Sequence, residues 1–229
     1  MQSDMTYTIT IQGDLSVARD DLHDNVAVEL VFEDGTRYIA TFFTLASIIA
    51  LMQRDQETGA REGGLYFWAI KPVIVRELTR DLIHRTVNVM IEEDWALDCG
   101  FHRVPDASAE PDVPVVHTDP DYHLRIYHMV DFPPEVRDAN VDVEIRFPDE
   151  RRYAATFFTL ENIAYLMDRH ARTGESDSGR HFYTIDLIIV REITRENIRA
   201  TLDALLQRRE LEKALLYLND DDDDDDEIE

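Results

Sequence analysis

The sequence predicts an α+β fold built from two tandem copies of one domain, each a β-β-β-α-β-α unit with a mainly antiparallel sheet. The string Ala40–Leu45 recurs 115 residues later as Ala155–Leu160. The same offset needs no gap between Asn25 and Arg80, where 29 of 56 positions are identical to their counterparts. Each copy also switches between strand-like and helix-like patterns in an order typical of α+β domains. A period of this length is too long for a solenoid and long enough for a whole domain.

The best-matched part of each copy begins with a β-hairpin. Apolar side chains alternate with other residues along Val26–Phe32, and Val141–Phe147 repeats the alternation. A period of two is typical of a strand with one buried face. The returning strands are expected at Arg37–Phe43 and Arg152–Phe158.

A further strand is expected before each hairpin. Tyr7–Ile11 in the first copy aligns with Tyr122–Ile126 in the second at the same offset. Each unit is therefore expected to open with three strands.

A helix is expected directly after each hairpin. Thr44 and Thr159 stand where a hydroxyl can accept from the first free amides of a helix. Gly59 and Gly174 stand where a left-handed residue commonly ends one. Apolar residues recur at helical spacing between these limits.

A polar loop, one more strand and a second helix complete each unit. The strand is rich in apolar and β-branched residues, and a threonine again precedes the helix as a candidate cap. The segments are 60–64, 65–75 and 79–91 in the first copy, and 175–179, 181–190 and 194–218 in the second.

These elements divide the chain into four parts. The first α+β repeat is expected at 1–92, a linker rich in proline and acidic residues at 93–120, the second repeat at 121–218, and a disordered poly-aspartate tail at 219–229. Trp95, Leu97 and Phe101 indicate that the first part of the linker packs against something.

The composition is strongly acidic, with a formal net charge of −25. Asp220–Asp226, Glu227 and Glu229 contribute nine of the acidic groups, which leaves an excess of 16 on the rest of the chain. Lys71 and Lys213 are the only lysines. Such a surface resembles that of proteins adapted to high salt, and it argues against direct binding to nucleic acid.

The chain carries no sign of a membrane or secretory segment. No run of about 18 apolar residues occurs, and the start of the sequence lacks a basic region followed by an apolar run. Cys99 is the only cysteine, which excludes an intramolecular disulfide and a cysteine-based zinc site. We therefore expect a cytoplasmic protein.

Most residues shared by the two copies are apolar, and we expect them to form the core. In the first copy they are Val26, Val28, Phe32, Tyr38, Phe42, Phe43, Leu45, Ile48, Leu51, Met52, Phe67, Ile70, Ile74 and Val75, each with a partner 115 residues later.

A smaller set of shared residues is charged, and it forms a candidate polar interaction site. Its members are Glu29, Arg37, Arg76 and Glu77, with Glu144, Arg152, Arg191 and Glu192 at the matching positions. Two interpretations stay open. In the first, Arg76-Glu77 and Arg191-Glu192 form surface ion pairs or tether the turns at Thr79 and Thr194. In the second, they form a polar site repeated by pseudo-symmetry.

Catalytic motifs are absent, so no catalytic, cofactor-binding or metal-binding residue is predicted. No glycine-rich phosphate loop and no nucleophile elbow occurs. His117, His123 and His128 cluster in sequence, but their spacing matches no standard zinc pattern. Cys99 and His102 lie outside the repeat.

The string from Tyr153 to Met167, followed by Thr173-Gly174, Phe182-Tyr183 and Ile189-Val190, resembles short uncharacterised bacterial proteins that carry one copy of this unit. The resemblance covers about 65 residues of each half and implies that the unit can exist singly. A tandem would then resemble a fused dimer, and no activity is carried over.

We expect a non-enzymatic interaction module, an adaptor or inhibitor of an unidentified protein, built as a monomer with an internal pseudo-two-fold axis or as a weak homo-oligomer. Two alternatives stay open. One is an acidic mimic of nucleic acid that occupies a nucleic-acid-binding protein. The other is an enzyme whose carboxylates, such as Glu77 and Glu192, line a groove between the repeats.

Overall fold

The computed structural model describes residues 6–12, 15, 25–93, 100–104, 121–127 and 140–218. Below, the first half is the described part up to residue 104, and the second half begins at residue 121. Helices and two sheets make up these residues, which confirms the predicted α+β class. Most of the predicted linker and the whole predicted tail lie outside the described residues.

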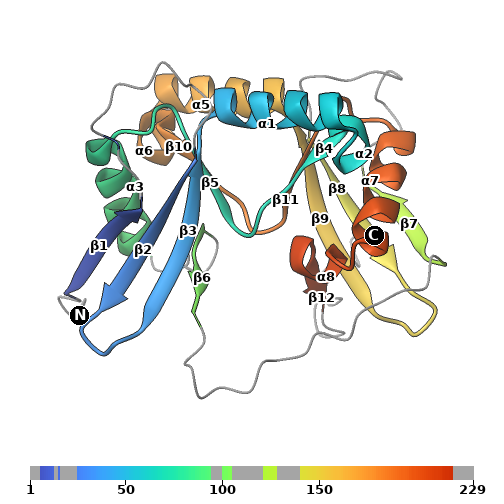
Figure 1. Ribbon diagram of the computed structural model, residues 1–229, viewed down its shortest axis with the longest axis horizontal. Helices are drawn as coiled ribbons and strands as arrows, with labels where there is room; N and C mark the ends of the chain where they lie inside the picture. The colour runs from blue at the N-terminus through green and yellow to red at the C-terminus, as the bar shows by residue number, and fades with distance from the viewer. Residues whose placement is uncertain are drawn as a thin grey trace, which may run out of the picture.

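The first sheet contains most strands of the first half (Figure 1). Its order is β1 (Tyr7–Gln12), β2 (Val26–Phe32), β3 (Arg37–Phe43), β5 (Pro72–Val75) and β10 (His181–Phe182), with β6 (His102–Arg103) paired to β3. The β3–β5 pair is parallel and the other pairs are antiparallel. The predicted hairpin and the strand before it are therefore confirmed.

The second sheet repeats this arrangement. Its order is β4 (Tyr66–Phe67), β11 (Leu187–Val190), β9 (Arg152–Thr159), β8 (Asn140–Arg146) and β7 (His123–Ile126), with β12 (Leu216–Leu218) paired to β9. Here the β9–β11 pair is parallel. As in the first sheet, all the other pairs are antiparallel.

The two halves exchange one short strand each. β4 of the first half pairs with β11 of the second sheet, and β10 of the second half pairs with β5 of the first. Tyr66 lies opposite Val190, and nine residues further along, Val75 lies opposite His181, so both pairings share one register. Residues 66–75 and 181–190 thus form one antiparallel ribbon that is paired at both ends, and its two chains separate in the middle.

This ribbon corrects the prediction of one continuous strand at 65–75 and another at 181–190. Each segment is two short strands that belong to different sheets. The break occurs because Pro72 and Leu187 turn to pair with Thr41 of β3 and Thr156 of β9. An apolar run shows that a segment is buried, but it does not show which neighbours bury it.

Two long helices lie across the ribbon, and two more cover the outer sheet faces (Figure 1). α1 (Leu45–Thr58) and α5 (Leu160–Thr173) run along the ribbon side, while α3 (Arg80–Glu92) and α7 (Arg195–Gln207) pack on the first and second sheets. Paired helices have bounds 115 residues apart. Among the described residues, no helix has the length and apolar character needed to cross a membrane.

The predicted threonine N-caps of the four long helices and the glycine C-caps of α1 and α5 are confirmed. Each N-cap hydroxyl accepts a hydrogen bond from the third amide of its helix, at 3.0 Å for Thr44, 3.2 Å for Thr159, 3.3 Å for Thr79 and 3.0 Å for Thr194. Gly59 and Gly174 adopt φ angles of 73° and 84°, as a left-handed C-cap requires.

The second helix of the second half is shorter than the prediction that extended it to Leu218. α7 ends at Gln207, and Arg209 takes a left-handed φ of 58° that reverses the chain. The short helix α8 (Leu211–Ala214) then buries Leu211 against the sheet, and β12 adds to the edge of β9.

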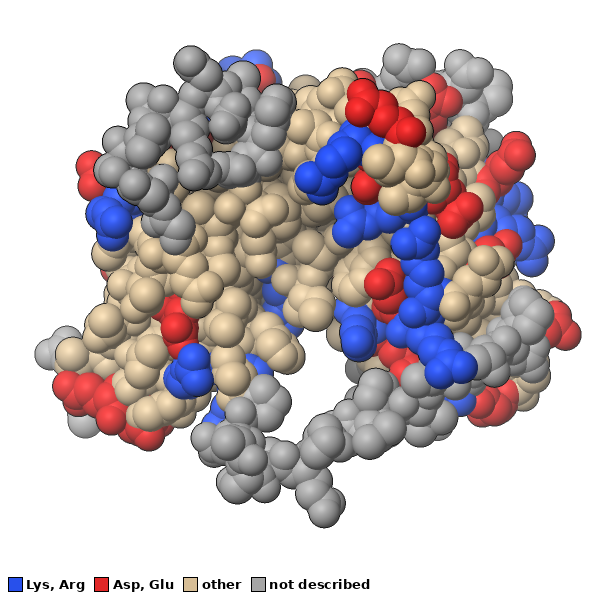
Figure 2. Space-filling model, in the orientation of Figure 1, with Lys and Arg blue, Asp and Glu red and all other residues tan. Residues whose placement is uncertain are grey.

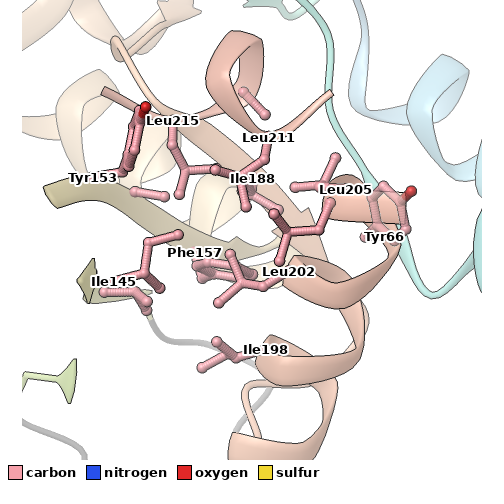
Figure 3. Packing of buried hydrophobic residues seen from close by; sticks show 14 of the residues in the cluster. Tyr66, Ile145, Tyr153, Phe157, Ile188, Ile198, Leu202, Leu205, Leu211 and Leu215 are labelled. Carbon is pink, nitrogen blue, oxygen red and sulfur yellow. The ribbon is translucent and has the colours of Figure 1, made fainter. Parts of the chain in front are cut away.

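Three apolar clusters hold these elements together. One lies between the second sheet and α7 with α8, and it includes Tyr66 of the first half, which Figure 3 shows beside Leu205. One lies between the first sheet and α3, and it includes Phe101. The third lies under α1 and α5 and draws residues from both halves, among them Phe43, Ile48, Met52, Phe158, Ile163 and Met167.

Phe101 bears out the expectation that the start of the predicted linker packs against something, which is the cluster between the first sheet and α3. Its side chain is 1% exposed and makes an edge contact with Phe42. Trp95 and Leu97 lie outside the described residues.

One pair of predicted core residues is instead on the surface. Ile70 and Ile185 occupy equivalent positions but are 46% and 47% exposed. They lie where the ribbon opens, so neither sheet covers them.

Candidate functional site

The shared arginines Arg76 and Arg191 bind the opposite half of the molecule. Arg76 Nε donates to the carbonyl oxygen of Gly179 at 2.8 Å, and Arg191 Nε donates to that of Gly64 at 2.8 Å. Arg76 Nη2 also donates to Asp168 at 2.9 Å, whereas Arg191 Nη2 donates to the carbonyl of Met52 at 3.2 Å. The guanidinium groups therefore fasten the exchanged segments, and they do not face each other across a shared pocket.

The receiving segments are two left-handed turns, α2 (Arg61–Gly64) and α6 (Glu175–Gly179), where the sequence predicts loops. All four residues of α2 have positive φ, and so do the last four of α6. A Cβ on Gly64 would lie 2.0 Å from the carbonyl oxygen of Met52, and one on Gly179 would lie 1.9 Å from that of Met167. Glycine is required there because of this close approach.

The shared pairs Glu29–Arg37 and Glu144–Arg152 are cross-strand ion pairs. Arg37 Nε lies 2.6 Å from Glu29 Oε1, and Arg152 Nε lies 2.8 Å from Glu144 Oε1. Both pairs alternate with core residues along their strands, so they lie on the sheet face that α3 or α7 does not cover.

The second of these pairs is the more enclosed. Burial acts to raise the pKa of Glu144, but hydrogen bonds from Arg152 and Tyr127 outweigh it and lower that pKa. A carboxylate held ionised in this way is suited to structural pairing and unsuited to accepting a proton at neutral pH.

Glu77 and Glu192 directly follow Arg76 and Arg191, and they precede the N-caps of α3 and α7. Glu77 is exposed, and Glu192 is half-buried, with its backbone carbonyl accepting from Asn197 Nδ2 at 3.0 Å. The eight residues of the candidate site thus lie in separate places. Four contribute to strand-face ion pairs, two to fastening of the exchange, and two flank the helix starts.

Sequence reasoning missed a carboxylate beside the opening of the ribbon. Burial raises the pKa of Asp186 to about 6, and the nearby charge of Asp142 acts in the same direction. Its counterpart in the first half is Lys71, which takes a left-handed φ of 46°. No repeated motif marks this position, because the two copies carry opposite charges there.

Of the three histidines that cluster in sequence, only His123 is among the described residues. His123 lies exposed on β7, whereas His117, His128 and Cys99 lie outside the described residues. Within the described ranges, no three His, Cys, Asp or Glu side chains come together as a metal site would require.

No family model, curated protein or solved structure matches the chain. The resemblance to single-copy bacterial proteins therefore stays a prediction.

Proposed function

We propose that this chain is a non-enzymatic protein-binding module, an adaptor or an inhibitor, that meets its partner at the notch between its halves. Figure 2 shows this notch on the side of the molecule away from α1 and α5. In this proposal the protein acts in the cytoplasm and uses an internal pseudo-two-fold arrangement in place of dimerisation.

The observation that carries the proposal is the exposure of Ile70 and Ile185. Both copies have isoleucine here, and in both the side chain is almost half exposed. Neither isoleucine belongs to any of the three apolar clusters, so core packing does not account for them. Apolar side chains at the centre of a protein interface gain stability when a partner covers them.

The edge strand beside the notch adds further apolar surface. Leu216 and Tyr217 of β12 are 40% and 48% exposed, and Tyr217 makes an edge contact with Tyr153 of β9. Figure 2 also shows lysine and arginine side chains gathered in a band on the half that carries α7 and α8. Apolar residues flanked by charged ones are typical of a protein-binding surface.

An enzyme is the second candidate, and Asp186 is the observation that favours it. Its pKa of about 6 suits a group that exchanges protons near neutral pH. Asp142 and Thr156 are its polar neighbours, and Thr156 Oγ1 donates to Asp142 at 3.0 Å. This hydroxyl–carboxylate pair is exposed to solvent, which does not activate a weak nucleophile, so we rank this function below binding.

The experiment is affinity capture at native ionic strength with three forms of the full chain. The test variant carries Ile70→Asp and Ile185→Asp, and the matched control carries Ile49→Asp and Tyr165→Asp. The control residues are exposed to a similar degree but lie on α1 and α5, away from the notch. We expect one stoichiometric partner on the wild type and the control, and its loss from the test variant.

Two results would overturn the proposal. One is retention of the partner by the Ile70/Ile185 variant at wild-type affinity. The other is substrate turnover by the isolated chain that Asp186→Asn abolishes, which would favour the enzyme instead.

A further inference from the structure

Each end of the ribbon where a strand of one half pairs with a sheet of the other is called a crossing. The two crossings, β4 with β11 and β10 with β5, are equivalent in backbone but differ in their side chains. β4 carries Tyr66, and at the same position in the second half β10 carries His181. Tyr66 is fully buried and His181 is 2% exposed. Among the described residues, neither Tyr66 Oη nor His181 Nδ1 has a hydrogen-bond partner.

His181 is enclosed by both halves. Its ring stacks on Tyr183 with centroids 5.4 Å apart and an angle of 13° between the planes. His181 pairs with Val75 of β5, while Glu93 at the end of α3 and Asp177 on the α6 turn act on its charge. Protonation of His181 would therefore place a charge between two packed elements of the first half and the turn of the second.

The nearby acids are already engaged by other groups. Asp177 accepts from Arg85 Nε at 2.6 Å and Nη2 at 2.5 Å, and from Arg180 Nη1 at 3.2 Å. Glu93 accepts from the Tyr183 hydroxyl at 2.9 Å. These bonds reduce the compensation that the two carboxylates can offer to a protonated imidazole.

A second histidine lies on the same crossing. His170 of α5 has Nδ1 buried without a partner among the described residues, and its Nε2 lies 3.5 Å from Glu175. The equivalent residue in the first half is Asp55, which pairs with Arg61 at 3.2 Å. The crossing of β10 with β5 thus contains two histidines. The other crossing has Tyr66 in place of His181, and Asp55, paired with Arg61, in place of His170.

We propose that acid opens the crossing of β10 with β5 and leaves the crossing of β4 with β11 closed. The buried site favours the neutral imidazole of His181, and an opened site lets water solvate the charged form. The other crossing lacks this response because tyrosine does not gain a proton at acidic pH. The exchange is thus an asymmetric, pH-dependent clasp.

The two protonation states of His181 determine in which direction pH changes the opening equilibrium. Burial lowers the pKa of His181, Asp177 and Glu93 act to raise it, and His170 adds to the lowering. An exposed histidine titrates near pH 6.5. Above that pH both states are neutral, and below it only the opened state takes up the proton. The equilibrium constant for opening therefore rises up to about tenfold for each pH unit below 6.5, until the folded pKa is reached.

The test is amide hydrogen exchange on the full chain at pH 7.5 and pH 5.5, corrected for intrinsic exchange rates. We expect the protection factors of His181 and Phe182 to fall by up to about tenfold at the lower pH. The protection factors of Tyr66 and Phe67 should stay within twofold. An equal loss at both crossings, or no loss at either, would overturn the proposal.

His181→Tyr supplies the decisive variant because it copies the residue at the equivalent position of the first half. It should abolish the acid-dependent loss, whereas His123→Tyr, on the exposed side of β7, should leave it as in the wild type. Loss that persists in His181→Tyr would contradict the proposal. If that variant does not fold, the NMR titration of His181 in the wild type decides, since a pKa at or above 6.5 is incompatible with the clasp.

Discussion

Arg76 reaches across the molecule to Gly179, with its Nε 2.8 Å from the glycine carbonyl oxygen. The residue 115 positions later, Arg191, makes the same bond to Gly64. Each arginine directly follows a strand of its own sheet and fastens the turn that precedes the strand received from the other half. The reciprocal bonds thus tie the strand exchange at both of its ends.

Replacement of this arginine should weaken the whole fold. Arg76→Ala removes charged donors from the Gly179 carbonyl and from Asp168, so we expect a loss of about 2 kcal/mol in the free energy of unfolding. Urea denaturation checks this value. Arg54→Ala, an exposed arginine of α1, should change stability by less than about 0.5 kcal/mol. Equal effects of the two changes would contradict a fastening role.

The left-handed turn α2 offers a sharper comparison between two adjacent glycines. Gly64→Ala places a Cβ against the Met52 carbonyl oxygen, and we expect a loss of about 3 kcal/mol. Gly63 has a similar φ of 69° but open space around the added atom, so Gly63→Ala should cost about 1 kcal/mol. Thermal denaturation of both variants measures the difference. Similar losses would show that backbone conformation alone matters there.

Asp186→Asn should stabilise the protein at neutral pH. Burial raises the pKa of this carboxyl from 3.8 to about 6, so folding disfavours its ionised form. The protonated carboxyl of Asp186 leaves the fold at its full stability below pH 3.8, and that stability is lost as the pH rises through about 6 and the group ionises. The shift corresponds to about 3 kcal/mol at pH 7, which the asparagine variant should recover.

The measurement is the difference in unfolding free energy between wild type and Asp186→Asn from pH 4 to pH 8. We expect a difference that grows with pH and levels off above about 7. Glu77→Gln, at an exposed site, should follow the wild type. A difference that is independent of pH would show that Asp186 titrates normally.

A substitution at Phe101 tests how much the segment 100–104 contributes to the stability of the fold. The side chain of Phe101 is 1% exposed in the cluster under α3, so Phe101→Ala should cost about 3–5 kcal/mol. Tyr165→Ala, at a residue 53% exposed, should stay within about 0.5 kcal/mol of the wild type. Chemical denaturation distinguishes the two. A small effect would contradict the packing of Phe101 in this cluster.

Local features of the fold could be predicted because they are local in sequence. The alternation along Val26–Phe32 marks a strand, and Thr44 with Gly59 marks both ends of α1. Caps and period depend on neighbouring residues, which a single sequence displays.

The strand exchange and the arrangement of the candidate-site residues could not be predicted because they depend on contacts between distant residues. Ile70 carries the pattern of a core residue, yet the opening of the ribbon exposes it. Arg76 reads as a surface residue, yet its partner lies 103 residues away. Asp186 and His181 differ from their counterparts in the repeat, so comparison of the copies gave no signal for either.

The reciprocal exchange of strands is the central feature of this fold, and backbone NOEs in the intact, isotope-labelled protein test it directly. We expect cross-strand contacts between Phe67 and Ile189 and between Phe182 and Ile74. Contacts from β4 to its own half, with no contact to β11, would contradict the exchange and the roles assigned to Arg76 and Arg191.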